Sequence, residues 1–342
     1  MLELPVIDIG PLWSSDHPQR GAVDSRIGAA IERHGAFMIG GFPDAERVDE
    51  WANAALTFFQ LADHEKRAVG SRGSVPEGPR IYRGYRNRPA PGGWAYNEFF
   101  DVGPAVPFAA PSPGTAAFAE PNVWPVRSPT EGWRAAMDSY YGLMSGVGTA
   151  VMLAAGRWAG FTDDDLEQRF CDGNSTLRLL HYPERPADWP LMATDDGLEP
   201  GAPPLSAIRH TDASGVSLLW QRDPGLQAEA PDGTWRSVPV LANGVSVHLG
   251  TVLEIMTAGR VRATPHRVID LGVIDQRSGD RESVGFFVEP GLGTRLVPIG
   301  DVAEPPCTAA AAALTFGTYG AHLQERFHAT PGFEHLIPAP DA

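Results

Sequence analysis

The segments Arg209-His210-Thr211-Asp212 and Thr264-Pro265-His266-Arg267-Val268 decide how this chain is organised. They supply two histidines and one carboxylate, in the pattern His-x-Asp followed by a distant His. Such a set fills one face of an octahedral Fe(II) and leaves the other positions open. Residues two apart in a strand point to the same side, so His210 and Asp212 can reach one metal together. His266 must then arrive from a strand that is distant in sequence but adjacent in space.

A His-x-Asp pair alone is a weak signal, and its simpler interpretation is a solvated strand end. The segment Arg281-Glu282-Ser283-Val284-Gly285-Phe286-Phe287 strengthens the metal hypothesis. The arginine offers a planar fork that pairs with a carboxylate through two hydrogen bonds, and Ser283 adds a hydroxyl donor beside it. A metal with open positions next to a carboxylate receptor is what a 2-oxo acid cosubstrate requires.

The residues around these motifs resemble a known family. The chain is similar to the Fe(II)/2-oxoglutarate-dependent dioxygenases of the isopenicillin N synthase-like branch. The segments that carry the resemblance are Leu218–Gln227, Trp235, Gly259-Arg260 with Thr264–Val268, and, near the N-terminus, Leu4–Asp8 and Arg33–Phe37. Together they span most of the chain.

The resemblance implies an α+β fold with a double-stranded β-helix (jelly roll) core, flanking N-terminal helices and a long central helix. We expect four parts. They are an N-terminal helical and strand region (1–128), scaffold helices (129–173), the Fe(II)/2-oxoglutarate jelly-roll core (174–295), and a C-terminal helix and tail (296–342).

The resemblance also implies roles for single residues. His210, Asp212 and His266 would hold Fe(II), and O2 would be the oxidant. The distal carboxylate of 2-oxoglutarate would pair with Arg281 and Ser283, assisted by Tyr182. Halogenating relatives of the wider superfamily have a small residue in place of the carboxylate ligand, so Asp212 favours oxygenation or desaturation.

Three functions are compatible with these residues. The first is an oxygenase that hydroxylates, desaturates or cyclises a small molecule and releases succinate and CO2. The second is a cosubstrate-free iron oxidase of the isopenicillin N synthase type, in which the Arg-x-Ser pair receives a substrate carboxylate. The third is a metal-binding jelly-roll protein without turnover. Because a full motif set in its context is specific, we favour the first.

Composition excludes several other classes of protein. A formal charge of −15 over 342 residues disfavours nucleic acid and anionic membrane surfaces as partners. The two cysteines, Cys171 and Cys307, are interpreted as free thiols of a reducing cytosol. The N-terminus lacks the basic and apolar runs of a signal peptide, so we expect a cytoplasmic protein. The sequence does not indicate an oligomeric state.

Periodicity and capping residues predict the main elements. Helices are expected over 23–34 with Gly35 as its cap, after Asp44, over 133–158, after Thr162 with Asp165 in a capping box, and over 308–328. Strands are expected at 4–8, 36–40, 97–103, 177–183, 216–221, 235–240 and 245–249. Residues 70–93 and 186–204 are expected to be loops, and 270–280 an exposed hairpin connection.

The site of the prime substrate is harder to predict. The stretch 81–94 concentrates arginines and aromatic side chains in an acidic chain. It is either a solvated loop or a substrate contact for an anion at the mouth of the jelly roll. The candidate contacts are Arg83, Arg86, Arg88, Tyr85 and Trp94, together with Phe287 or its neighbour Phe286, one of which should face the pocket. Strand alternation predicts that His248 lies on the surface, and whether the C-terminal tail covers the site stays open.

Overall fold

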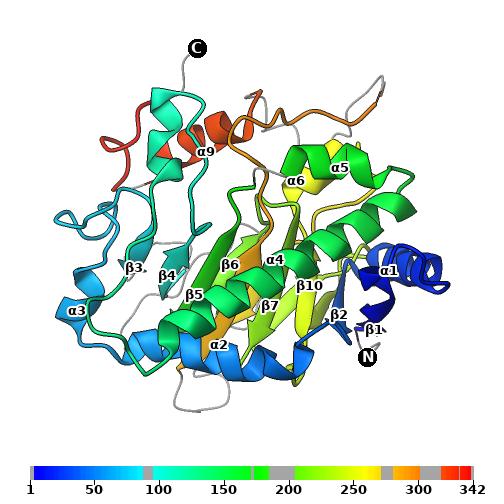
Figure 1. Ribbon diagram of the computed structural model, residues 1–342, viewed down its shortest axis with the longest axis horizontal. Helices are drawn as coiled ribbons and strands as arrows, with labels where there is room; N and C mark the ends of the chain where they lie inside the picture. Colours follow the sequence, from blue (N-terminus) through cyan, green and yellow to red (C-terminus); the bar gives the residue numbers. More distant parts are fainter. Residues whose placement is uncertain are drawn as a thin grey trace.

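The computed structural model describes residues 4–87, 95–170, 173–184, 205–270, 280–300, 317–330 and 332–339. Its strands form two sheets (Figure 1). The larger sheet has the order β1-β2-β10-β7-β12-β5-β4-β3 and the smaller has the order β6-β11-β8-β9. The strands are β1 Val6–Asp8, β2 Ala36–Gly40, β3 Gly84–Asn87, β4 Glu98–Val102, β5 Thr176–Tyr182, β6 Leu205–His210, β7 Val216–Gln221, β8 Leu226–Glu229, β9 Trp235–Ser237, β10 Val245–Leu249, β11 His266–Ile269 and β12 Arg281–Phe287.

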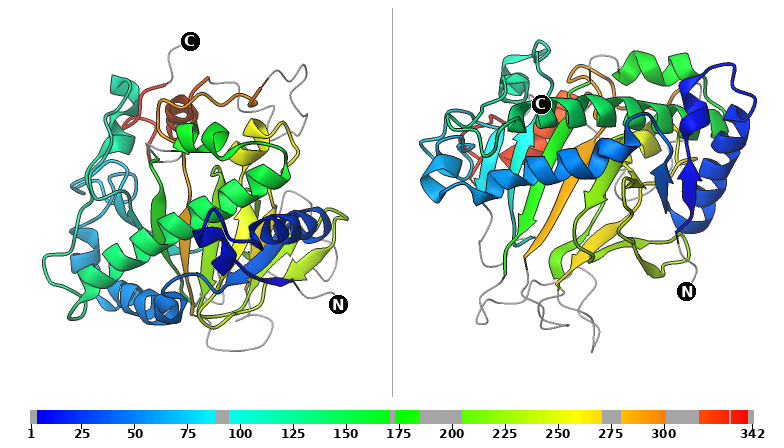
Figure 2. Two further views of the ribbon diagram at one scale, coloured as in Figure 1. Left: turned by 45° about the vertical axis from the view of Figure 1, so that its right-hand side comes forward. Right: turned by 60° about the horizontal axis from the view of Figure 1, so that its bottom comes forward.

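Helices cover the outer face of the larger sheet. The α-helices are α1 Arg20–His34, α2 Val48–Leu56, α3 Asp63–Arg67, α4 Trp133–Trp158, α5 Asp163–Phe170, α6 Thr251–Met256 and α9 Tyr319–His328. Short 3-10 helices are η1 Gly10–Trp13, η2 Ala45–Arg47, η3 Thr57–Gln60 and η4 Pro113–Ala119. The long helix α4 crosses the strands, with α2 beside it and α1 near β1 and β2 (Figures 1 and 2).

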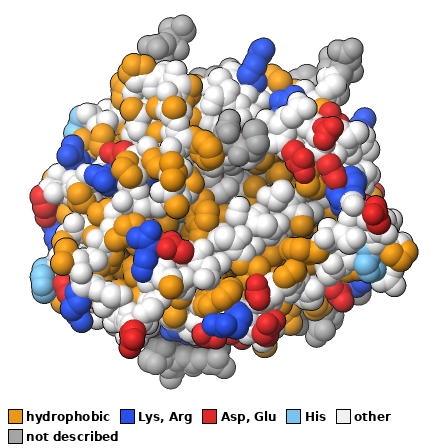
Figure 3. Space-filling model, in the orientation of Figure 1, with side chains coloured by type: hydrophobic (Ala, Val, Ile, Leu, Met, Phe, Trp, Pro, Cys, Tyr) orange, Lys and Arg blue, Asp and Glu red, His pale blue; other side chains and the backbone are white. Residues whose placement is uncertain are grey.

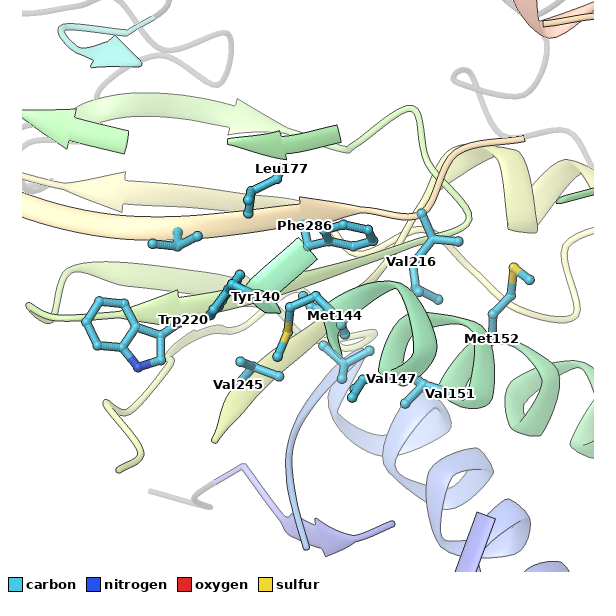
Figure 4. Packing of buried hydrophobic residues seen from close by; sticks show 14 of the residues in the cluster. Tyr140, Met144, Val147, Val151, Met152, Leu177, Val216, Trp220, Val245 and Phe286 are labelled. Carbon is cyan, nitrogen blue, oxygen red and sulfur yellow. The ribbon is translucent and has the colours of Figure 1, made fainter. Parts of the chain in front are cut away.

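The main core lies between α4 and the larger sheet. Tyr140, Met144 and Val147 of α4 point toward strand residues such as Trp220 and Phe286 (Figure 4). These positions follow the helical spacing of an apolar stripe, which buries one face of α4. The predicted bounds of this helix, 133–158, are therefore confirmed.

A second core lies on the opposite face of the larger sheet. Along β7, Leu218 belongs to the core under α4, whereas Leu219 belongs to a cluster with Leu226 and Val268 of the smaller sheet. Successive strand residues point to opposite faces, so both faces of β7 are buried. The space between the two sheets holds the candidate site described below.

Several local predictions are confirmed. Gly35 ends α1 with φ 70°, and its N–H donates to Ile31 O. The capping box before α5 is present, since Thr162 and Asp165 exchange hydrogen bonds. The expected strands at 36–40, 216–221 and 245–249 have the bounds of β2, β7 and β10.

Other predictions are wrong. Part of the expected loop 70–93 is strand β3, which pairs with β4. It begins at Gly84, whose φ is 107° and where a Cβ would lie 2.3 Å from Val69 O. Asp44 adopts φ 55° and makes no side-chain cap, so α2 begins at Val48 instead. The strand at 235–240 ends at Ser237, and β8 and α6 were not predicted.

Three expectations fall outside the described residues. They are the loop at 186–204, the connection at 271–279, and residues 308–316 of the expected C-terminal helix, whose described part is α9. Within the described ranges, no helix has the length and apolarity needed to cross a bilayer. On the face drawn in Figure 3, basic and acidic side chains are interspersed.

The packing of α4 on the sheet can be tested at a glycine. A Cβ at Gly148 would lie 2.4 Å from Val288 Cγ2, whereas a Cβ at Gly146 would meet nothing within 4 Å. We expect Gly148→Ala to lower the free energy of unfolding by about 1–3 kcal/mol, because the core is overpacked. Gly146→Ala is the matched control and should raise it by roughly 0.5–1 kcal/mol. Urea unfolding measures both, and equal effects would contradict this account of the helix–sheet contact.

Candidate metal centre and adjoining pocket

Two paired strands bring His210, Asp212 and His266 together. His210 ends β6, His266 begins β11, and the two residues lie opposite each other in the antiparallel pair. Their ring centroids are 4.3 Å apart. Asp212 Oδ1 is 3.9 Å from His210 Nε2, and Asp212 Oδ2 is 3.7 Å from His266 Nε2. Each residue offers one ligand atom within 4.8 Å of the others. Because β6 ends at His210, the loop that follows it brings Asp212 into position, whereas the sequence suggested strand alternation.

Backbone carbonyls orient both imidazoles. His210 Nδ1 lies 2.8 Å from Ile208 O, and His266 Nδ1 lies 3.1 Å from Thr264 O. A carbonyl only accepts, so each Nδ1 carries the proton and each Nε2 presents its lone pair to the centre. Burial, with the neighbouring His266, lowers the pKa of His210 to about 4. The imidazole is therefore neutral near pH 7, as a metal ligand must be.

Asp212 is held as a carboxylate. Ser217 Oγ donates to Asp212 Oδ2 at 2.6 Å, and the N–H of Thr251 donates to the Asp212 backbone carbonyl at 2.8 Å. Burial acts to raise the pKa of Asp212, but the two histidines and Ser217 outweigh it and lower this pKa. Two imidazoles and one carboxylate suit a non-haem Fe(II), so the donor set fits this metal.

The prediction for His248 is wrong. Every residue of β10 is buried, and His248 is 0% exposed. Its ring centroid lies 4.9 Å from that of His266. Alternation predicted a surface position because it assumed one solvated face, but β10 has a packed neighbour on each face. Burial lowers the pKa of His248 to about 3, so the ring is a neutral packing partner of His266.

A buried cation lies in the same pocket as the three candidate ligands. Arg281 is 7% exposed and donates from Nη1 to Ser283 Oγ at 3.1 Å. Its other hydrogen bonds run to neutral acceptors, Gln221 Oε1 at 3.1 Å and Pro224 O at 3.0 Å. No carboxylate of a described residue forms an ion pair with it, and burial lowers its pKa. An arginine desolvated in this way favours an incoming anion.

Strand pairing explains how the parts of this receptor meet. Tyr182 of β5 lies opposite Arg281 of β12, and the guanidinium carbon is 5.1 Å from the centroid of the tyrosine ring. Gln221 of β7 lies opposite Ser283. Sequence reasoning missed Gln221, because its proximity depends on the register between β7 and β12. The walls of the pocket include four apolar side chains, Leu180, Leu219, Leu226 and Val268.

The C-terminal helix α9 closes a second hollow, which adjoins this pocket at Asp212 and Phe287. Arg326 and Phe327 of α9 line it. The first residue of the helix, Tyr319, is anchored beneath, since its hydroxyl donates to Glu289 Oε1 at 2.6 Å. Helix α9 therefore covers part of the site, whereas the question left open by the sequence concerned the tail that follows this helix.

Of the five substrate contacts expected in the stretch 81–94, three are buried and two lie outside the described residues. Arg83 and Arg86 are each 1% exposed, so the solvated-loop interpretation is wrong for them. Arg83 bonds to Thr176 and Asn174, and Arg86 donates to Tyr82 O. Tyr85 likewise donates to buried Glu98. All three side chains are buried, and none of them lines either hollow. Arg88 and Trp94 lie outside the described residues.

Phe287 lines both hollows while Phe286 is in the core, as strand alternation predicts. Arg178 and Arg326 also line both hollows, and sequence reasoning missed them. A signal for Arg178 was present, because it precedes Tyr182 by an even number of residues along β5 and shares its face. No local pattern marks Arg326.

Comparison with known proteins agrees with this geometry. A family model described as the 2OG-Fe(II) oxygenase superfamily matches residues 173–290. Another, described as the non-haem dioxygenase in morphine synthesis N-terminal, matches residues 4–127. Isopenicillin N synthase of Streptomyces clavuligerus is 29% identical over 300 residues, covering 84% of each chain. The 2-oxoglutarate-dependent dioxygenase citB of Monascus ruber is 29% identical over 315 residues, covering 88% of this chain and 89% of its own.

A similar fold occurs in a solved structure from Caulobacter crescentus, of a protein assigned to the 2OG-Fe(II) oxygenase family. Its TM-score is 0.71, with 24% identity and coverage of 96% of this chain and 99% of that one.

If the three side chains form a metal site, His266→Ala should abolish tight Fe(II) binding while the fold persists. The loss is expected because two protein ligands remain where three are needed. Anaerobic titration with Fe(II) measures the binding, and circular dichroism monitors the fold. His64→Ala, at an exposed position of α3, is the control and should bind Fe(II) like the wild type. Unchanged binding by His266→Ala would remove His266 from the ligand set.

The hydroxyl of Ser217 should matter for the same metal. Ser217→Ala removes the donor to Asp212 Oδ2, and loss of such an outer contact typically weakens metal affinity about 10–100-fold. Ser71→Ala is a matched control, because Ser71 is also fully buried and donates one hydrogen bond, to Ile81 O. Equal Fe(II) affinities of the two variants would show that Ser217 does not support the ligand.

Proposed function

This chain belongs to the 2OG-Fe(II) oxygenase superfamily, in its isopenicillin N synthase-like branch, and on that premise we propose how its residues act. It is an Fe(II)- and 2-oxoglutarate-dependent oxygenase, an oxidoreductase that uses O2 to oxidise a small-molecule substrate. The substrate is hydroxylated, desaturated or cyclised while 2-oxoglutarate is converted to succinate and CO2. The observation that carries the assignment of residues is a buried arginine, unpaired with any described carboxylate, in the same pocket as a His/Asp/His cluster.

His210, Asp212 and His266 are the proposed Fe(II) ligands. When bound, Fe(II) supplies the redox chemistry that couples O2 to the decarboxylation of 2-oxoglutarate and the oxidation of the substrate. The carbonyls of Ile208 and Thr264 hold the imidazoles in the tautomer that can bind metal. Ser217 keeps one carboxylate oxygen of Asp212 in place. Orienting contacts of this kind keep a site ready before the ligand arrives.

Arg281 and Ser283 are the proposed receptor for the distal carboxylate of 2-oxoglutarate. Arg281 is held by Gln221 and Pro224, so its fork is oriented before the cosubstrate binds. Tyr182 packs against the guanidinium and limits its movement. The apolar side chains of the pocket exclude water, which strengthens the ion pair that forms there. The receptor and the proposed metal ligands line the same pocket, so one cosubstrate molecule would contact both.

The remaining assignments concern partners and place of action. We assign a small-molecule substrate, since the site lies in a pocket lined by residues of both sheets. Nucleic acid is a poor partner for a chain of net charge −15. A cytoplasmic location is consistent with the use of only two cysteines.

Replacement of Arg281 by Lys tests the receptor. Lysine keeps the charge but lacks the planar fork, so we expect the Kd for 2-oxoglutarate to rise about tenfold or more. The measurement is an anaerobic titration of the Fe(II) protein, followed by the visible charge-transfer band of the bound 2-oxo acid. Arg222→Lys is the control, because Arg222 pairs with Glu282 outside the pocket.

The same titration discriminates between the two iron-dependent functions. A wild-type protein that develops no such band and releases no succinate during turnover would be a cosubstrate-free oxidase. In that enzyme Arg281 and Ser283 would receive the substrate's own carboxylate.

A further inference from the structure

We propose that the prime substrate carries a carboxylate and that Arg326 of α9 binds it. This inference rests on the proposed function, since it takes Arg281 to be the receptor for 2-oxoglutarate. It concerns the part of the site that the cosubstrate and the metal leave free.

The position of Arg326 is the first observation. It lines both the hollow that contains Asp212 and Phe287 and the pocket that contains His210 and Arg281. Leu323, Phe327 and Thr330 line the first hollow with it. These residues are three or four apart, so one face of α9 and its continuation is turned toward the site. Because Tyr319 anchors the start of the helix, the backbone that carries Arg326 is held in place.

Arg326 is exposed, and no described residue neutralises its charge. Its guanidinium forms no hydrogen bond or ion pair with any residue in the described ranges. The other arginine common to both hollows, Arg178, makes a two-pronged ion pair with Asp101, at 2.7 and 2.8 Å. Arg178 and Arg326 therefore line the same hollows, and the guanidinium of Arg178 is already paired with Asp101.

The two carboxyl groups that line the hollow, Asp212 and Glu289, have other partners or roles. Glu289 lines the hollow, but its oxygens accept from Tyr319 at 2.6 Å and from Thr176 at 2.7 Å. Burial raises the pKa of Glu289, which favours its neutral form. Asp212 is assigned to the metal. Since no described carboxylate pairs with it, the exposed guanidinium of Arg326 can receive an anion that enters the hollow.

The chemistry favours a carboxylate over a phosphate. One guanidinium fork matches one planar, singly charged carboxylate, whereas a dianion would need a further free cation. Phe287, Leu323 and Phe327 line the same hollow and give it apolar surface, which suits a hydrocarbon or aromatic body. In a chain of net charge −15, a local cation is also needed to attract an anionic ligand. Fixing one end of the substrate would then limit which carbon reaches the metal.

A panel of matched probes tests the proposal without knowledge of the natural substrate. The Fe(II)- and 2-oxoglutarate-loaded protein is titrated anaerobically with phenylacetate, 3-phenylpropionate, cinnamate and octanoate, and with the primary amide of each. Binding is measured from the melting temperature and from perturbation of the visible band. We expect at least one acid to bind about tenfold more tightly than its amide, since a charge-assisted hydrogen bond is lost in the amide.

Variants assign the preference to one side chain. Arg326→Gln should abolish the preference for the acid, and Arg326→Lys should retain part of it. Arg33→Gln removes the same charge from the exposed side of α1 and should behave like the wild type. All three variants should bind 2-oxoglutarate with unchanged affinity.

Three results would overturn the proposal. They are a panel in which no acid binds better than its amide, an Arg326→Gln variant that keeps the preference, and an Arg326→Gln variant that loses affinity for 2-oxoglutarate. Failure of the proposed function is a separate result, in which the wild-type protein neither binds 2-oxoglutarate nor forms succinate. The melting temperature still reports the preference for the acid in that case.

Discussion

Antiparallel pairing of β6 with β11 sets His266 opposite His210, and the geometry of the site depends on this contact. The register is held by apolar residues on the same face, because Val268 lies near Ala207 of β6 and opposite Leu226 of β8. A slip of one residue would turn His266 to the other face and expose Val268. Hydrophobic burial between the sheets therefore decides where two imidazole nitrogens meet.

Four described arginines that are buried or partly buried have different partners. Arg178 has a carboxylate partner in Asp101, and Arg83 has neutral partners in Asn174 and Thr176. Arg86 lies 3.8 Å from Asp101 Oδ2 and about 5 Å from the ring centroids of Tyr82, Phe99, Phe327 and Phe333. Arg281 has neutral acceptors within the described structure, which leaves its charge available. An uncompensated buried charge is costly, so such a position is favourable only if an anion binds there.

The sequence alone determined the elements whose signals are local. The apolar stripe of α4, the Thr162–Asp165 capping box and the glycine cap of α1 each depend on residues within a few positions of one another. The candidate metal ligands were also identified from sequence, because a His-x-Asp motif and a later histidine are specific in combination with Arg-x-Ser. Strand alternation, which is also a local pattern, predicted that Phe287 and Phe286 face opposite sides of the sheet.

Only the tertiary structure decided which side chains face the pocket and which are enclosed. His248 was predicted to be exposed because alternation within β10 does not reveal that both of its faces are covered. Arg86 looked like a loop residue, but it lies in β3, which pairs with β4, and Arg83, just before β3, is held by Thr176 and Asn174. Arg326 reaches the site from a helix far along the chain, through the anchoring of Tyr319 on Glu289. Burial and strand register arise from contacts between distant segments, so no local pattern in the sequence encodes them.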